Sequence, residues 1–169
     1  MPIATRNAPC PAASLYGCVA AALLAAAVSS PLPADEAPAD APIDEELRCL
    51  ALALYFEARS EGPDGMHAVG SVVLNRIEHE EFPSTPCEVV KQGGETPPCQ
   101  FSWWCDGKSD VPRDAEQWEI ALAVAAALLE DRGEDPTHGA LFFHSASISA
   151  PWRVERTWTA TIHGHVYYR

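Results

Sequence analysis

One stretch of the chain, residues 45–61, combines the apolar spacing of a buried helix with two glutamates one turn apart. Apolar side chains recur there at the three- and four-residue intervals of one buried helical face, at Leu47, Leu50, Ala51, Leu54 and Ala58. At about 100° per residue, Glu61 projects near the middle of that face and Glu57 near its edge. A buried carboxylate must be paired, hydrogen-bonded or held protonated by a raised pKa. The stretch therefore predicts a core helix that carries an acid in an unusual environment.

Two interpretations of this glutamate pair follow from its spacing. A protonated carboxylic acid beside a cleft is what cleavage of a glycosidic bond requires. Alternatively, Glu57 and Glu61 lie on a solvated helix end near Arg59, where charged residues are common. The apolar neighbours Tyr55 and Phe56 favour the functional interpretation.

The first 34 residues have the features of a secretory signal peptide. Arg6 is the only charged side chain before Asp35, and an Ala-rich apolar stretch at 12–28 is followed by small residues. An uncleaved membrane anchor is the alternative, since the stretch is long enough to span, although it is only weakly apolar. We favour cleaved export, which leaves no stable membrane insertion. Residues 35–44 then form a Pro/Ala-rich linker, and 45–169 form one folded domain.

The charge of the chain excludes several classes of partner. Its net charge is −13, with 24 acidic against 11 basic side chains, and it becomes about −14 when Arg6 leaves with the signal peptide. Such a surface repels nucleic acid and anionic lipid. The chain also lacks a phosphate-binding glycine loop and a dinucleotide fingerprint. We expect no cofactor, and we expect the protein to be a monomer.

The cysteines of the predicted domain are even in number, which in an exported chain suggests disulfides. Four cysteines follow the signal peptide: Cys49, Cys87, Cys99 and Cys105. They allow three pairings, of which Cys99 with Cys105 and Cys49 with Cys87 is the one we favour. A zinc site is the alternative, but no C-x-x-C pair is present.

The order of predicted elements describes a mainly helical α+β fold. Gly62-Pro63 is expected to end the first helix, a second helix is expected at about 64–80, and Thr85-Pro86 starts a short third helix that runs to about 92. A long ordered loop at 93–112 carries aromatic residues that form either its core or the walls of a ligand groove. A fourth helix follows at about 113–131. A short strand at 141–143 and an alternating pair at 156–168 complete the domain as a small antiparallel β element.

Other catalytic arrangements have weaker support in the sequence. The three C-terminal histidines His144, His163 and His165 suit a zinc site, but no carboxylate at a persuasive spacing completes it. Hydrogen bonds in a polar groove explain these histidines equally well, so we expect no metal. No G-x-S-x-G motif or recognisable Ser-His-Asp arrangement is present.

Motifs in the order and spacing of a known family run through nearly the whole predicted domain, from about Cys49 to Tyr168. The two longest are residues 53–61 and 65–76, and the shorter ones are Phe82-Pro83, 87–90, 100–102, 139–144, Pro151-Trp152 and 164–168. In these motifs the chain resembles the cell wall hydrolases of the spore cortex-lytic enzyme type (SleB/CwlJ-like).

The resemblance implies a lysozyme-like α+β fold and cleavage of peptidoglycan between N-acetylmuramic acid and N-acetylglucosamine. Glu57 matches the motif glutamate that acts as general acid, and Glu61 becomes a supporting residue. The family resembles lytic transglycosylases, in which this acid protonates the leaving oxygen and then helps the sugar's own 6-hydroxyl to close an anhydro ring. The alternatives are a hydrolytic muramidase, a catalytically silent peptidoglycan-binding module and, as a third option, a zinc amidase. The implied location is the periplasm or the cell wall.

The resemblance also suggests which residues bind the glycan. The supporting or substrate-binding candidates are Glu61, Asn75, Gln100, Phe101, Ser102, His144, Trp152 and His165, and we expect Phe101, Trp103 and Trp152 to stack on sugars. The chain departs from the usual motifs at two positions, because Ser60 and His163 each stand where the family has glycine.

Overall fold

The computed structural model describes residues 43–169. The predicted signal peptide (1–34) lies outside the described residues, as does the predicted linker (35–44) apart from its last two residues, Ile43 and Asp44. Within the described part, no helix has both the length and the hydropathy of a membrane span.

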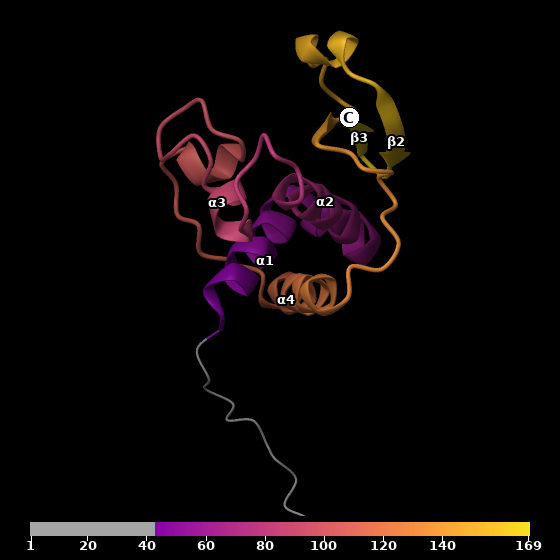
Figure 1. Cartoon of the computed structure of the whole chain (residues 1–169). Helices are drawn as coiled ribbons and strands as arrows, with labels where there is room; N and C mark the ends of the chain where they lie inside the picture. Colours follow the sequence, from indigo (N-terminus) through magenta and orange to yellow (C-terminus); the bar gives the residue numbers. More distant parts are fainter. Residues whose placement is uncertain (1–42) are drawn as a thin grey trace, which may run out of the picture. The chain divides into compact units, whose positions relative to one another are not determined.

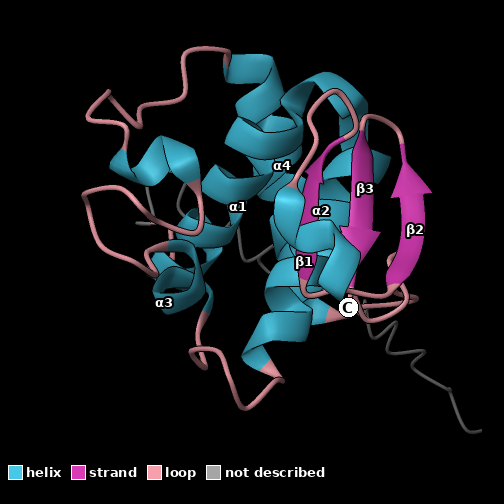
Figure 2. Ribbon diagram, turned by 90° about the horizontal axis from the view of Figure 1, so that it is seen from above, coloured by secondary structure: helices cyan, strands magenta, loops and turns pink. Residues whose placement is uncertain are grey.

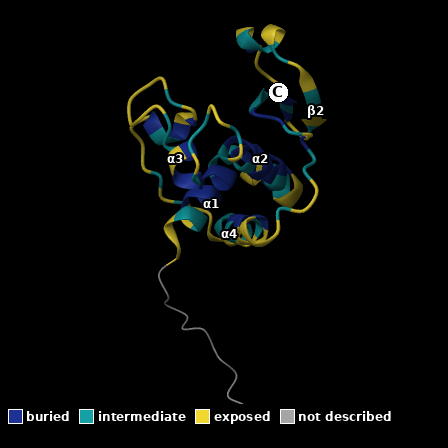
Figure 3. Ribbon diagram, viewed as in Figure 1, coloured by how far each residue is buried: buried dark blue, intermediate teal, exposed yellow. Residues whose placement is uncertain are grey.

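Helix α1 (Glu45–Ala58) is the buried centre of the helical part, as its apolar spacing predicts (Figure 3). It begins at Asp44, whose carboxylate accepts hydrogen bonds from the backbone N–H groups of Glu46 and Leu47 at 3.0 and 3.2 Å. Leu50 and Leu54 are fully buried. The other three helices pack against α1 (Figure 1). This packing holds the residues at its C-terminal end in a defined position.

The first helix ends at Ala58, and the prediction that it continues to Gly62-Pro63 is wrong. Residues Arg59–Glu61 form a 3₁₀ turn, η1, and helix α2 (Gly62–Ile77) follows directly. Gly62 has a φ of 71°, a left-handed conformation that glycine adopts without steric cost. Pro63 fits the first turn of α2 because its missing N–H would have no helical partner there. Glu57 and Glu61 therefore lie on different elements rather than on one helical face.

Helices α3 (Pro86–Val90) and α4 (Ala115–Glu130) lie within a few residues of their predicted positions. The Thr85 hydroxyl accepts a hydrogen bond from the Glu88 N–H at 3.3 Å, as expected for a capping box. Helices α1, α2 and α4 approach closely at Gly70, where a Cβ atom would lie 2.4 Å from Leu128 Cδ1. This close packing buries the apolar faces that the sequence pattern predicts.

The C-terminal part forms one three-stranded antiparallel sheet in the order β1-β3-β2 (Figure 2). Its strands are β1 (Phe142–Ser145), β2 (Trp158–Ile162) and β3 (His165–Tyr168), and the 3₁₀ segment η3 (Pro151–Glu155) lies between the first two. The predicted C-terminal hairpin is present as β2 and β3. Its turn places His163 at a φ of 47°, a left-handed conformation that glycine adopts without steric cost and that other residues rarely adopt.

Both favoured disulfides are present in the structure. Cys49 on α1 is bonded to Cys87 on α3, and Cys99 is bonded to Cys105 within the long loop that precedes α4. That loop contains the 3₁₀ segment η2 (Ser102–Cys105). Because all four cysteines of the domain are paired, none is left to bind zinc.

Candidate active site

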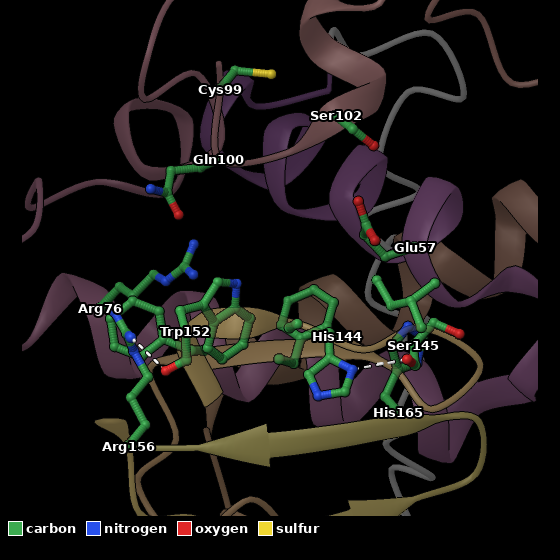
Figure 4. Close-up of a pocket in the computed structure, with 14 residues that line it drawn as sticks. Glu57, Arg76, Cys99, Gln100, Ser102, His144, Ser145, Trp152, Arg156 and His165 are labelled. Atoms are coloured by element: carbon green, nitrogen blue, oxygen red, sulfur yellow. Dashed lines mark hydrogen bonds between the residues drawn. The ribbon is translucent and has the colours of Figure 1, made fainter. Parts of the chain in front are cut away.

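The sheet and the loop before α4 border a cleft of about 590 Å³ (Figure 4). The C-terminal end of α1 contributes Glu57 to this cleft, the loop contributes Gln100 and Ser102, and β1 contributes His144. Trp152 comes from η3, and His165 comes from β3. Predicted site residues from widely separated segments of the chain therefore line one cavity.

Glu57 is the only carboxyl group among the described residues that line this cleft. It lies in the last turn of α1, where the neighbouring Phe56 stacks on Trp103 with ring centroids 4.8 Å apart. Burial raises the pKa of Glu57, while the charges of His165 and Arg76 oppose that rise. Among residues 43–169 no group donates a hydrogen bond to this carboxyl. Glu57 thus has the environment of an acid that keeps its proton at higher pH than an exposed carboxyl does.

Glu61 lies behind the cleft wall and holds the β2–β3 turn. One of its carboxylate oxygens accepts a hydrogen bond from the Gly164 N–H at 3.2 Å, and the other lies 3.1 Å from His165 Nδ1. A carboxylate can only accept, so His165 donates from Nδ1 and its Nε2 is left for other partners. Both side chains are largely buried, at 9% exposed for His165 and 13% for Glu61. Glu61 is therefore placed to orient His165, a residue that acts electrostatically on Glu57.

Two glycines leave the space that the Glu61 side chain occupies. A Cβ atom on Gly164 would lie 2.6 Å from Glu61 Oε1, and one on Gly65 would lie 2.4 Å from Glu61 Cβ. Either substitution would force the carboxylate away from its partners, because real Cβ atoms do not approach other atoms so closely.

We expect Glu61→Ala to lower the free energy of unfolding by about 1–3 kcal/mol, because the buried His165 ring and the Gly164 N–H both lose their acceptor. Glu61→Gln should recover part of this loss, since its amide oxygen still accepts one of the two bonds. Chemical denaturation of both variants measures the effect. Asp64→Asn, an exposed carboxylate three residues away, serves as the control and should change stability by less than about 0.5 kcal/mol. An unchanged stability for Glu61→Ala would contradict the anchoring role.

His144 is held against the sheet beside Trp152. Its ring stacks on Tyr168 with centroids 5.5 Å apart, its Nδ1 lies 2.8 Å from the Ser145 carbonyl oxygen, and its Nε2 lies 3.3 Å from the Tyr168 hydroxyl. The Trp152 ring packs edge-on against both the His144 and Tyr168 rings. This aromatic cluster gives the cleft a rigid wall of the kind that sugar rings pack against.

Three predicted glycan-binding residues, Asn75, Phe101 and Trp103, lie outside the cleft. The Asn75 amide donates to Asp135 Oδ2 at 3.0 Å and to the Ala140 carbonyl oxygen at 2.9 Å, so it connects the loop after α4 to α2.

Phe101 is 1% exposed and packs against Arg76 and Trp103. Trp103, also expected to stack on a sugar, is buried as well. Both aromatics belong to the main hydrophobic core, where Trp103 stacks on Phe56 of α1.

Several lining residues were missed from sequence, namely Arg76, Phe142, Phe143, Ser145 and Arg156. The sequence does contain a pattern that could have identified Arg76, because this residue continues the apolar face of α2 at the spacing of Met66, Val69 and Val73. An arginine at such a position must be buried with partners or reach a cavity. Arg156 had no comparable signal because it follows the irregular segment η3.

The candidate zinc histidines do not come together. Within residues 43–169, no three His, Cys, Asp or Glu side chains gather as a set of metal ligands. His163 is exposed in the β2–β3 turn, while His144 and His165 bond to Ser145 and Glu61 respectively. The hydrogen-bonding interpretation of His144 and His165 is therefore the one that fits this geometry.

A model of the Cell Wall Hydrolase family matches residues 60–168, starting three residues after Glu57. Among curated proteins, the spore cortex-lytic enzymes of Bacillus subtilis (strain 168) and Halalkalibacterium halodurans are each 30% identical over 125 residues. Each match spans 73% of this chain, but only 37% and 34% of the respective relatives. The chain thus corresponds to about a third of the length of these relatives.

Two solved structures share the fold. The catalytic domain of the Bacillus cereus SleB protein has a TM-score of 0.56 at 26% identity, covering 73% of this chain and 89% of that one. The catalytic domain of the germination-specific lytic transglycosylase SleB from Bacillus anthracis has a TM-score of 0.58 at 27% identity, covering 73% and 93%. The predicted lysozyme-like α+β fold, mainly helical with a small antiparallel β element, is confirmed.

Proposed function

The chain belongs to the Cell Wall Hydrolase family, and from this premise we propose that it cleaves peptidoglycan strands between N-acetylmuramic acid and N-acetylglucosamine. One observation carries the proposal: Glu57, with a pKa raised by burial, is the single carboxyl group of residues 43–169 that faces the cleft. An acid of this kind protonates a leaving oxygen that water alone would protonate too slowly.

We propose a lytic transglycosylase mechanism with Glu57 as both acid and base. Protonated Glu57 gives its proton to the glycosidic oxygen as the bond from that oxygen to the muramoyl C1 breaks. The 6-hydroxyl oxygen of the same muramoyl residue then bonds to C1, and its proton passes to the Glu57 carboxylate. The products are a 1,6-anhydromuramoyl end and a free hydroxyl on the leaving sugar, and Glu57 regains its proton.

Among the residues that the structure describes, no second carboxylate lines the cleft, which favours this mechanism over the two-carboxylate schemes of most glycosidases. Glu61 is the carboxylate nearest to Glu57 in sequence, but both of its oxygens are already hydrogen-bonded, to Gly164 and His165. When the sugar's own 6-hydroxyl is the nucleophile, no second carboxylate is needed to activate a water molecule. One acid is then sufficient.

The remaining cleft residues suit a glycan ligand. Gln100 and Ser102 are exposed polar side chains on the loop above Glu57 (Figure 4), where they can hydrogen-bond to sugar hydroxyl and acetamido groups. Trp152 and His144 form an aromatic wall for the apolar face of a sugar ring. A peptidoglycan substrate implies that the enzyme acts outside the cytoplasm, in the periplasm or at the cell wall, with neither nucleic acid nor a cofactor involved.

Product analysis tests the proposal directly. Purified peptidoglycan is incubated with the protein, and the released muropeptides are identified by mass spectrometry. Anhydromuropeptides are expected, because the 6-hydroxyl replaces water. Products with ordinary reducing ends would instead indicate a hydrolytic muramidase. Binding to peptidoglycan without any cleavage would leave only a silent glycan-binding module.

The rate of cleavage should fall as pH rises through the raised pKa of Glu57, because only the protonated acid can donate. The alkaline limb of the pH–rate profile should accordingly lie above the ordinary range of a glutamate pKa.

His165→Gln removes a charge that lowers the pKa of Glu57, so it should move this alkaline limb to still higher pH. Initial rates on solubilised glycan strands from acid to mildly alkaline pH measure the limb in both proteins. A limb that moves to lower pH in His165→Gln would contradict the electrostatic assignment.

A further inference from the structure

We propose that Arg76 and Arg156 form a subsite for a substrate carboxylate. In Figure 4 these two arginines lie with Trp152 on the side of the cleft away from Glu57. The inference rests on the proposed function, since it names the group on the peptidoglycan strand that this end of the cleft would hold.

The Arg76 guanidinium is buried, with an unused donor. The residue is 4% exposed, and its only hydrogen bond among the described residues runs from Nε to the Leu141 carbonyl oxygen at 2.8 Å. Its Nη1 is buried without a hydrogen-bond partner. The group is flanked by Phe82, Phe101 and Phe142, whose ring centroids lie 5.2–5.9 Å from Cζ. Aromatic faces stabilise the cation but accept no conventional hydrogen bond, so the donor still needs an acceptor.

Arg156 approaches the same aromatic ring. Its Cζ lies 3.9 Å from the Phe142 centroid and 5.1 Å from that of Trp152. Its Nη1 donates to the Trp152 carbonyl oxygen at 3.2 Å, while its Nε is buried without a partner. Phe142 therefore fixes two guanidinium groups at one end of the cleft, and each has an unsatisfied donor.

Neither arginine forms an ion pair with a carboxylate of residues 43–169. This is unexpected in a chain with 24 acidic and 11 basic side chains. The charge of Glu57 acts on Arg76 through the cleft without direct contact. Two cations that line a cavity without a carboxylate partner, in an otherwise acidic domain, are suited to an anionic ligand. The planar fork of a guanidinium matches the two oxygens of a carboxylate.

Peptidoglycan offers such a carboxylate next to the proposed cleavage site. The lactyl ether of N-acetylmuramic acid ends in a free carboxylate when the strand has lost its peptide, and in an amide when the peptide is present. In the second case the stem peptide carries carboxylates of its own. Either group would mark the muramoyl residue and distinguish it from N-acetylglucosamine, which is uncharged.

The test measures binding to three soluble oligomers by the full chain carrying Glu57→Gln, so that cleavage does not interfere. The oligomers are a peptide-free strand with free lactyl carboxylates, the same strand with those groups converted to methylamides, and the same strand with its peptide stems. Arg156→Gln should weaken binding of the peptide-free strand by about tenfold or more, and leave the methylamide strand unaffected, because a charge-assisted hydrogen bond is lost only in the first case. If only the stem-bearing strand is weakened, the carboxylate comes from the peptide.

Arg153→Gln is the matched control, because Arg153 lies in η3 and bonds to Ser149 and Ala150 rather than lining the cleft. It should leave all three dissociation constants unchanged. Arg156→Lys should restore part of the affinity, and melting temperatures identify any variant that fails to fold. Equal dissociation constants with and without Arg156→Gln, or an equal loss on all three oligomers, would overturn the subsite. A wild-type chain that binds carboxylate strands but never cleaves them would instead refute the proposed function alone.

Discussion

Replacing Glu57 by glutamine should lower the rate of glycan cleavage by about 10²- to 10⁴-fold, the usual contribution of a general acid. Glutamine has nearly the same shape but no acidic proton, and no other carboxyl group lines the cleft among the described residues. The rate of muropeptide release from purified peptidoglycan measures the loss. Glu119→Gln, an exposed position on α4, should retain full activity. A rate for Glu57→Gln close to that of the wild type would contradict the assignment of the acid.

The same variant should not be less stable than the wild type at neutral pH. Burial raises the pKa of Glu57 in the folded state, so its ionised form is disfavoured there relative to the unfolded chain. The stability contribution of the protonated acid is complete at low pH and is lost as pH rises through the folded-state pKa. Glutamine does not ionise, so the free energy of unfolding of Glu57→Gln relative to wild type should increase with pH across this window. Denaturation at several pH values measures the difference, and the opposite trend would contradict the raised pKa.

Removing the Cys49–Cys87 disulfide by replacing both residues with alanine should lower the free energy of unfolding by about 4 kcal/mol, the loop-entropy value for a separation of 38 residues. This bond joins α1 to α3, and no other disulfide between the described residues links these helices. Chemical denaturation of the oxidised variant and of wild type gives the difference.

The Cys99–Cys105 disulfide provides the comparison, because its separation of 6 residues predicts a smaller loss of about 2 kcal/mol. Its removal should affect cleavage more than stability, since Cys99 itself lines the cleft beside Gln100 and Ser102. Removal of Cys49–Cys87 should lower the stability of the domain but leave the cleavage rate nearly unchanged at temperatures where the domain stays folded. A larger loss of stability from the short loop than from the long one would contradict this division.

Local patterns predicted most of the secondary structure. The apolar spacing of residues 47–58 indicated α1, and the Thr85-Pro86 capping signal indicated α3. The alternation of 156–168 indicated the C-terminal hairpin. These signals work because backbone hydrogen bonding, capping and the burial of one face depend on residues only a few positions apart.

The same patterns failed at the end of the first helix. Helical spacing alone places Glu61 on the buried face of α1, but a 3₁₀ turn intervenes and moves it to the start of α2. Its partners there are His165 and Gly164, more than a hundred residues away in sequence. Motif position likewise places Phe101 and Asn75 in the groove, but Phe101 packs into the main hydrophobic core and Asn75 bonds to the α4–β1 connection.

Local sequence patterns are therefore enough to place a carboxylic acid at the end of an apolar helix, because propensity and periodicity are local properties. What that acid faces depends on how the chain packs in three dimensions. The cleft, the opposing charges of His165 and Arg76, and the guanidinium of Arg156 are brought together from separate segments by helix packing and sheet pairing. A pKa and a binding surface depend on solvent exclusion and on charges within a few ångströms in space, and distances along the chain do not specify these.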